Sequence, residues 1–221
     1  MAEQAQLNGT VGTAADRHTI AFNIGAIGSQ QLIQPLSALP PISDPAIVDG
    51  GSQGGAGYNG LPLVELSGNL PGFGMVGLDI TAGNSTVQGF AIDIFSLTGI
   101  RLQTNGGNAI VSNHIGTDPT GMVDRGNLRG IWIDSVPDNR IENNLISGHD
   151  NFNSGLGIEI SGIAARNNQV IPNLIGTDVK GNDTLLGNVG DDIACGGGGH
   201  DYLQGDENND VLDGCEGNDT I

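Results

Sequence analysis

The sequence predicts an all-β protein in which short parallel strands stack as the coils of a solenoid. Glycine supplies 38 of 221 residues, far above its usual share of roughly 7%, and asparagine supplies 22. Aromatic residues reach only 4%, so the composition is that of a chain rich in turns. The hydrophobic share of 37% is nevertheless too high for general disorder. Between the turns, apolar strand patterns recur at matching offsets, which is typical of a repeat architecture.

The first part of the chain is predicted to be an N-terminal segment, residues 1–17, followed by capping coils over residues 18–66. Four short apolar segments in this region are predicted strands, at 18–24, 31–33, 46–49 and 63–66. Pro40, Pro41, Pro45 and a glycine-rich loop over 50–60 interrupt them.

Four repeated strands follow, each a glycine and then strict apolar alternation, which is typical of a strand with one buried face. They start at unequal intervals, at Gly77, Gly99, Gly130 and Gly157. A β-meander would not keep this phase, whereas coils with a constant core and variable loops would. Equivalent apolar residues should then stack in two interior columns. These are Leu78, Ile100, Ile131 and Ile158, and beside them Ile80, Leu102, Ile133 and Ile160.

A second repeated block carries asparagines at fixed offsets. Asn108, Asn139 and Asn168 fall in one predicted column, and Asn113, Asn144 and Asn173 in another. Their amides are expected to bond the coils above and below, as in ladders of stacked strands. The motif Ile-Gly-Thr-Asp at 115–118 recurs at 175–178 and indicates excursions between coils. The solenoid is expected to span residues 18–186.

The last residues, 187–221, are predicted to form a separate metal-binding unit. Residues 181–221 carry ten acidic residues and no Lys or Arg, so a cation is needed there. Residues 196–204 fit the nonapeptide G-G-x-G-x-D-x-U-x, where U is a large apolar residue. Asp192, Asp201, Asp210 and Asp219 occupy the same position in successive nonapeptides. Because two nonapeptides complete one turn, Asp192 should face Asp210, and Asp201 should face Asp219.

The predicted cation is Ca²⁺, because carboxylates and loop carbonyls together offer the six to eight oxygen ligands that it prefers over Mg²⁺ or Zn²⁺. The predicted metal-site residues are Asp192, Asp201, Asp210, Asp219, Gly196, Gly198 and Gly205. Asn208, Asp206 and Cys215 depart from the glycine pattern, which favours the Asp201/Asp219 site over the Asp192/Asp210 site. The alternative is a flexible acidic linker. Cys195 and Cys215 either pair or remain two thiols.

Two resemblances follow from these motifs. Residues 37–40, 47–50 and 81–89, with the two Ile-Gly-Thr-Asp stretches, resemble right-handed parallel β-helix repeat proteins of large bacterial exported and surface proteins. The tail is similar to the repeats-in-toxin (RTX) β-roll. This implies calcium in the loops and export through a one-step bacterial channel that recognises the C-terminus. A secreted or cell-surface location is therefore expected, although the first residues lack a secretory signal pattern.

Charge and patterning restrict the partners. The net charge of −18 disfavours a nucleic-acid surface, which needs clustered Lys and Arg. No apolar run approaches the ~18 residues of a membrane helix, so membrane insertion is not expected. Calcium ions and a polysaccharide or cell-surface glycan are the expected partners.

An outward stripe on the first strand series is the candidate glycan face. It contains Asp79, Arg101, Trp132, Asp134 and Glu159. The stripe is similar in outline to the active sites of polysaccharide lyases with this fold. In those enzymes, carboxylates hold Ca²⁺ against a uronate, and a Lys or Arg removes a proton. The alternative is an ordinary solvated face with Asp79 and Arg101 as an exposed pair.

The sequence therefore favours a structural, adhesive or glycan-binding module over an enzyme. The alternatives are a lyase or uronate C5-epimerase acting on an acidic polysaccharide, and a fragment without independent function. The Asp-Pro-His-Asp motif of the epimerases is present only in fragments, at 118–120 and 149–150. No Gly-x-Ser-x-Gly, Walker or His-Glu-x-x-His motif occurs.

Overall fold

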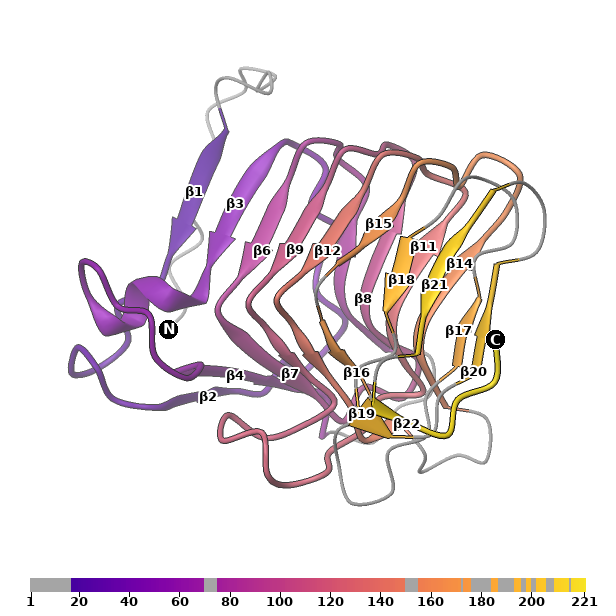
Figure 1. Cartoon of the computed structure of the whole chain (residues 1–221). Helices are drawn as coiled ribbons and strands as arrows, with labels where there is room; N and C mark the ends of the chain where they lie inside the picture. The colour runs from indigo at the N-terminus through magenta and orange to yellow at the C-terminus, as the bar shows by residue number, and fades with distance from the viewer. Residues whose placement is uncertain are drawn as a thin grey trace.

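The computed structural model consists of short strands arranged in parallel sheets (Figure 1). It describes residues 17–69, 75–149, 155–171, 173–175, 184–186, 193–195, 198–199, 202–205, 209–214 and 216–221. The helical element that lies wholly within these ranges is one short 3-10 helix, η1 (Gly50–Gly54). None of these residues belongs to a helix long and apolar enough to cross a membrane.

Three sheets, here called A, B and C, contain nearly all the strands. Sheet A has the order β1 (His18–Ala21), β3 (Ala46–Asp49), β6 (Thr86–Gln88), β9 (Ala109–Val111), β12 (Arg140–Glu142), β15 (Gln169–Val170), β18 (Ile193–Cys195) and β21 (Val211–Asp213). Sheet B has the order β2 (Gln31–Ile33), β4 (Val64–Ser67), β7 (Phe90–Asp93), β10 (His114–Ile115), β13 (Leu145–Ile146) and β16 (Leu174–Ile175). Sheet C has the order β5 (Val76–Ile80), β8 (Thr98–Gln103), β11 (Arg129–Asp134), β14 (Leu156–Ser161), β17 (Thr184–Leu186) and β20 (Tyr202–Gln204). A two-stranded sheet joins β19 (Gly198–Gly199) to β22 (Glu216–Gly217).

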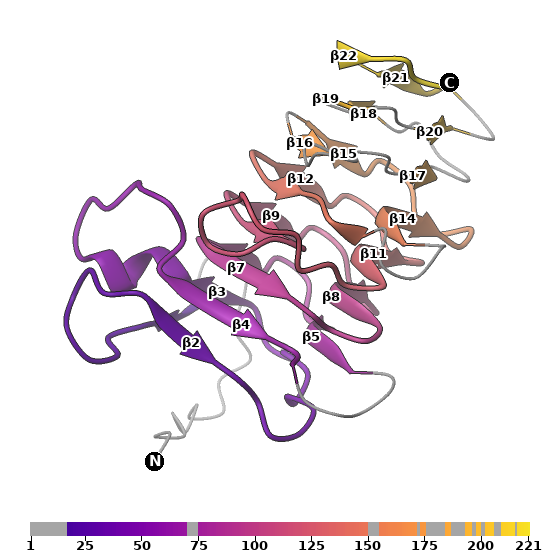
Figure 2. The same cartoon turned by 90° about the horizontal axis from the view of Figure 1, so that it is seen from below.

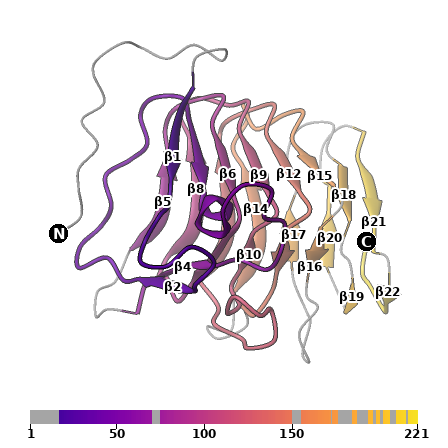
Figure 3. The ribbon, with the colours of Figure 1, turned by 90° about the vertical axis from the view of Figure 1, so that its left-hand side faces the viewer.

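Neighbours within a sheet are not consecutive in the chain, because from β3 to β18 the chain visits sheets A, B and C in turn before it returns to A. From β5 to β18, the strands of each sheet are three elements apart. All pairings between the named strands are parallel. Figures 2 and 3 show the strands following one another along one axis, from β1 and β2 to β21 and β22. The arrangement is consistent with a solenoid.

The predicted interior columns are confirmed by the register of sheet C. Ile100 pairs with Leu78 on one side and with Ile131 on the other, and Ile131 pairs with Ile158. These side chains are buried, as are those of the neighbouring column. A fully buried aliphatic side chain contributes about 1.5–3 kcal/mol. Since each side chain packs against the coils above and below, no coil could bury its apolar face alone.

The predicted asparagine columns are also confirmed, and both are buried. In one, the Asn144 amide oxygen accepts the backbone N–H of Asn113 at 3.0 Å, and Asn173 does the same for Asn144 at 3.0 Å. In the other, Asn139 accepts the N–H of Asn108 and Asn168 accepts that of Asn139, each at 3.0 Å. These bonds satisfy backbone donors between the strands, which would otherwise be buried without partners.

The strand boundaries differ slightly from the prediction. The segment predicted at 18–24 ends as a strand at Ala21, and that predicted at 63–66 is shifted to Val64–Ser67. The repeated glycines lie inside the strands of sheet C, directly after the first residue of each strand. The reason is contact between coils: a Cβ atom on Gly77 would lie 2.5 Å from the carbonyl oxygen of Gly99 in the next coil.

Candidate functional site

The coils become shorter toward the C-terminus, which sets the geometry of the candidate metal site. On sheet C, Leu185 pairs with Ile158 before it and with Leu203 after it. The interval from Leu185 to Leu203 equals two nonapeptides, whereas the interval from Ile158 to Leu185 is longer. Two nonapeptides therefore make one coil, as the sequence predicts. Sheets A and C continue into these coils without interruption (Figure 1). The other C-terminal pairs keep the interval of two nonapeptides: Ile193 with Val211, Gly198 with Glu216, and Tyr202 with Thr220.

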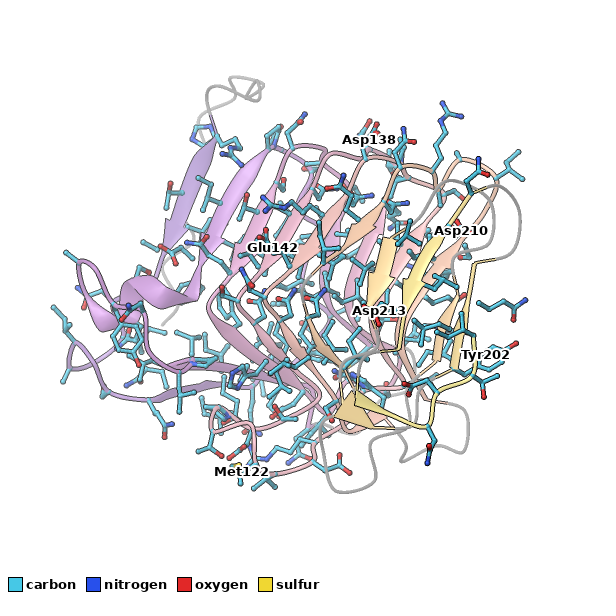
Figure 4. All side chains as sticks on the ribbon, viewed as in Figure 1. Met122, Asp138, Glu142, Tyr202, Asp210 and Asp213 are labelled. Atoms are coloured by element: carbon cyan, nitrogen blue, oxygen red, sulfur yellow. The ribbon has the colours of Figure 1, made fainter. Side chains whose placement is uncertain are left out.

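Asp210 and Asp219 occupy equivalent positions in successive nonapeptides. Asp210 directly precedes β21, and Asp219 directly precedes the bridge residue Thr220. Each carboxylate lies against the buried glycine that begins its nonapeptide: a Cβ atom on Gly205 would collide with the Asp210 side chain, and one on Gly214 with that of Asp219. In these two nonapeptides, the first glycine thus leaves the space that the aspartate of the same loop fills. Figure 4 shows Asp210 among the C-terminal coils, just before β21, with Asp213 at the far end of that strand.

The remaining predicted metal-site residues are only partly within the described ranges. Gly198 lies in β19, opposite Glu216. Asp192, Asp201 and Gly196 lie outside the described residues, so the pairings with Asp210 and Asp219 stay predictions. Cys215 also lies outside them, and its pairing with Cys195 is therefore untested.

The donor chemistry of these loops fits a hard cation. Their side-chain donors are carboxylates, and their glycine-rich backbone offers carbonyl oxygens, both of which Ca²⁺ accepts. Among the described residues, no group of three or more His, Cys, Asp or Glu side chains is gathered as metal ligands would be.

The predicted outward stripe exists on sheet C. Asp79 pairs with Arg101, Arg101 with Trp132, and Trp132 with Glu159. Asp134 belongs to the neighbouring column. Arg101 binds both carboxylate oxygens of Asp79, with Nε–Oδ1 at 3.0 Å and Nη2–Oδ2 at 2.8 Å. The hydrogen bond to Asp79 raises the pKa of Arg101, so Arg101 is fixed as a cation.

Trp132 lies between two arginines. The guanidinium carbons of Arg101 and Arg129 are 5.9 and 5.2 Å from its ring centroid, within the range of cation–π contacts. Arg129 also pairs with Glu159, and the Trp132 indole N–H donates to Ser161 Oγ at 2.8 Å. The stripe is thus an ordered array of paired charges around one aromatic ring. Sequence reasoning missed Arg129, although it precedes the glycine of its repeat.

The structure also contains a groove that sequence reasoning did not identify. Two adjoining cavities of about 540 and 610 Å³ share the loop segment 59–62 and Ser112 as lining residues. Tyr58 and Asp49 line the first cavity, and His114 lines the second. The glycine-rich loop over 50–60, which the sequence indicates only as an interruption between strands, is the signal that points to it.

Comparison with known proteins identifies the C-terminal repeats. The family described as "RTX calcium-binding nonapeptide repeat (4 copies)" matches residues 179–203 and 196–221. No curated protein matches the chain, and no solved structure matches it. The C-terminal nonapeptides are therefore calcium-binding repeats, which confirms the predicted calcium ions and the resemblance of the tail to this repeat family.

We expect Gly205→Ala to weaken calcium binding at least several-fold, because the new methyl group would displace the Asp210 carboxylate. The measurement is a calcium titration followed by calorimetry, with Gly51→Ala as the control. A Cβ atom on Gly51 would approach nothing closer than Asp49 Oδ1, at 3.2 Å, outside the repeats. Equal calcium affinities for Gly205→Ala and the wild type would show that the position of the Asp210 carboxylate does not contribute to calcium binding.

Proposed function

We propose that this protein is an exported bacterial calcium-binding β-solenoid that acts as a structural, adhesive or glycan-binding module, secreted or at the cell surface. Residues 18–186 would form a right-handed parallel β-helix and residues 187–221 a calcium-binding β-roll. The observation that carries the proposal is the continuity of sheets A and C from the long coils into the coils of two nonapeptides. Calcium in the last coils would thereby stabilise the C-terminal end of the whole stack.

The calcium concentration that the C-terminal repeats need favours an extracellular role. Ten acidic residues without a single Lys or Arg in residues 181–221 repel one another until cations neutralise them. Extracellular calcium modules bind with dissociation constants of about 10⁻⁴–10⁻³ M, far above the calcium concentrations that cytosolic sensors detect. The C-terminal coils would consequently form after export, where calcium is abundant.

The glycan-binding part of the proposal rests on sheet C. Asp79, Arg101, Trp132, Asp134 and Glu159 lie on consecutive coils of one sheet face. Neighbouring strands are about 4.8 Å apart, close to the scale on which a polysaccharide presents its sugars. The ordered arginines flanking Trp132 favour an acidic glycan, because the ring and the two cations offer stacking and charge together.

The glycan-binding proposal is tested by titrating the protein with polyuronate in millimolar calcium and recording the fluorescence of Trp132. We expect a saturable change in emission, and at least tenfold weaker binding by Arg129→Ala measured by calorimetry. Asp138→Asn, an exposed turn variant, serves as the control. Unchanged Trp132 emission at a high polyuronate concentration would contradict the proposal that sheet C binds the glycan.

The alternative function, a polysaccharide lyase or uronate C5-epimerase, makes a different prediction. We expect no rise in ultraviolet absorbance from unsaturated products when polyuronate is incubated with the protein and calcium. A proton acceptor must be within reach and unprotonated, whereas Arg101 is held as a cation by Asp79. A rise that Arg101→Ala abolishes would replace the binding module with the lyase. Altered uronate stereochemistry, measured by NMR, would favour the epimerase.

A further inference from the structure

Asp93, the last residue of β7, is a buried carboxylate with unusual surroundings. Its side chain is 0% exposed, and neither carboxylate oxygen has a hydrogen-bond partner among the described residues. The nearest cation is Arg125, whose Nη1 lies 3.5 Å from Asp93 Oδ2. Buried charged groups are normally paired through hydrogen bonds, since desolvation strongly disfavours the ionised form. Asp93 therefore stands in an environment that favours its neutral form.

A second carboxylate competes for the same arginine. Glu65 on β4 forms an ion pair and hydrogen bond with Arg125 Nη1. Burial and, to a smaller extent, the charge of Glu65 raise the pKa of Asp93 to about 7, whereas Ser67 and Arg125 act in the opposite direction. The charged groups that act on Asp93 are Glu65 on β4 and Arg125 on the following loop. The histidines beside this loop are His114 on β10, whose pKa is lowered by burial, and His149, whose ring lies against Gly116. Two carboxylates thus share one guanidinium.

Arg125 belongs to the loop 116–126 between β10 and β11, and the base of this loop is attached on both sides of Asp93. The Gly116 N–H donates to the carbonyl of Ile92 at 2.9 Å, and the Ile94 N–H donates to that of Arg125 at 3.0 Å. Ile94 has a φ of 56°, which is unfavourable for a β-branched residue. The loop is therefore joined to β7 at a strained point of the backbone.

The loop has its own internal bonds. Asp118 accepts the Thr120 hydroxyl at 2.8 Å and the backbone N–H groups of Met122 and Val123 at 3.2 Å each. Met122 lies at the outer end of the loop (Figure 4) and is 85% exposed. A segment with this internal bonding can leave the sheet as a unit when its base is released.

We propose that Glu65, Asp93 and Arg125 form a proton-operated clamp that holds the loop 116–126 against sheet B and weakens when Asp93 loses its proton. With Asp93 protonated, Glu65 and Arg125 form a neutral pair. Ionised Asp93 places a second negative charge in the same water-poor site. Lifting the loop gives both carboxylates access to water, so loss of the proton favours the open loop.

The direction of the pH effect follows from linkage. A carboxyl group whose pKa is raised in the closed state stabilises that state fully below its ordinary pKa of 3.8. The stabilisation is lost as the pH rises from there to about 7, and it does not change further at higher pH. One proton changes the opening equilibrium by at most about tenfold per pH unit within this window. The loop is closed most firmly in acid and least firmly above neutrality.

Hydrogen exchange of the full chain in calcium tests the clamp. Protection factors of the Ile94 and Arg125 amides, corrected for intrinsic exchange rates, are measured from pH 5 to pH 8. We expect them to fall by up to about a hundredfold between pH 5 and pH 7 in the wild type. In Asp93→Asn, which cannot ionise, this fall should be lost. Equal pH slopes in the two proteins would overturn the proposal.

Two further variants exclude other causes. Asp138→Asn removes an exposed carboxylate from a turn and should keep the wild-type slope. Glu65→Gln removes the repelling charge and should move the midpoint of the transition to lower pH. If Asp93→Asn fails to fold, this shift remains measurable, and an unmoved midpoint in Glu65→Gln would equally contradict the clamp. Circular dichroism of each variant shows whether the fold is retained.

Discussion

Removal of calcium is expected to unfold the last coils of this protein while the coils over residues 77–175 stay folded. The physical reason is that the repeats concentrate carboxylates and bury few large apolar side chains, with Leu203 as the fully buried one among the described residues of the tail. Without cations, repulsion keeps the tail loose. At a calcium concentration of 100 times the dissociation constant, binding stabilises the folded tail by about 2.7 kcal/mol.

Circular dichroism and limited proteolysis with and without a chelator measure this effect. We expect β-structure to be lost, and new cleavage sites to appear within residues 187–221 alone. Calcium should restore both, and magnesium at equal concentration should not. Asp210→Asn and Asp219→Asn should raise the calcium concentration required, with Asp138→Asn as the control. Unchanged dichroism and protease resistance after chelation would contradict the prediction.

Asn144→Ala is expected to destabilise the long coils by about 3–5 kcal/mol. Asn144 is 2% exposed and lies within a column of buried amides. Its amide oxygen accepts the Asn113 N–H at 3.0 Å, and its amide nitrogen donates to the carbonyl of Ile110 at 2.8 Å. Truncation leaves both backbone groups buried without these partners, and each unsatisfied group costs about 1–3 kcal/mol.

The adjacent residue provides the matched control. Asn143 is exposed and has a φ of 54°, a conformation that glycine adopts readily. Asn143→Gly is therefore expected to change the free energy of unfolding by less than about 1 kcal/mol. Urea denaturation in saturating calcium measures both variants. Equal midpoints for Asn144→Ala and Asn143→Gly would show that the asparagine column does not stabilise the stack.

The periodic part of the structure was predictable from the sequence. Equal offsets in successive repeats placed Ile100 over Leu78 and Asn113 over Asn144, because a solenoid converts a repeated spacing in the chain into direct contact. The nonapeptide phase of the aspartates predicted the short coils of the tail in the same way. The glycine-rich pattern also pointed to calcium, since it offers backbone carbonyls beside carboxylates.

The glycines of sheet C show where this reasoning stopped. The sequence indicated that Gly77 and Gly99 begin the repeats, but their inward contact with the neighbouring coil became visible only in the structure. Similarly, the stripe of Asp79, Arg101 and Trp132 was predictable from alternation. The paired charges that hold its side chains were not, because rotamers depend on neighbours in the other strands.

The sequence by itself determined the repeat register, the buried columns and the cation of the tail, because each depends on residues at regular spacing. Only the tertiary structure brought Glu65, Asp93 and Arg125 together, since they come from two strands and a loop of no repeating length. Loop lengths outside the core vary from coil to coil. Contacts between side chains of different loops therefore cannot be predicted from the repeat spacing and become visible only in the folded structure. The stacked frame is therefore encoded locally, whereas the clusters of charged side chains depend on the completed fold.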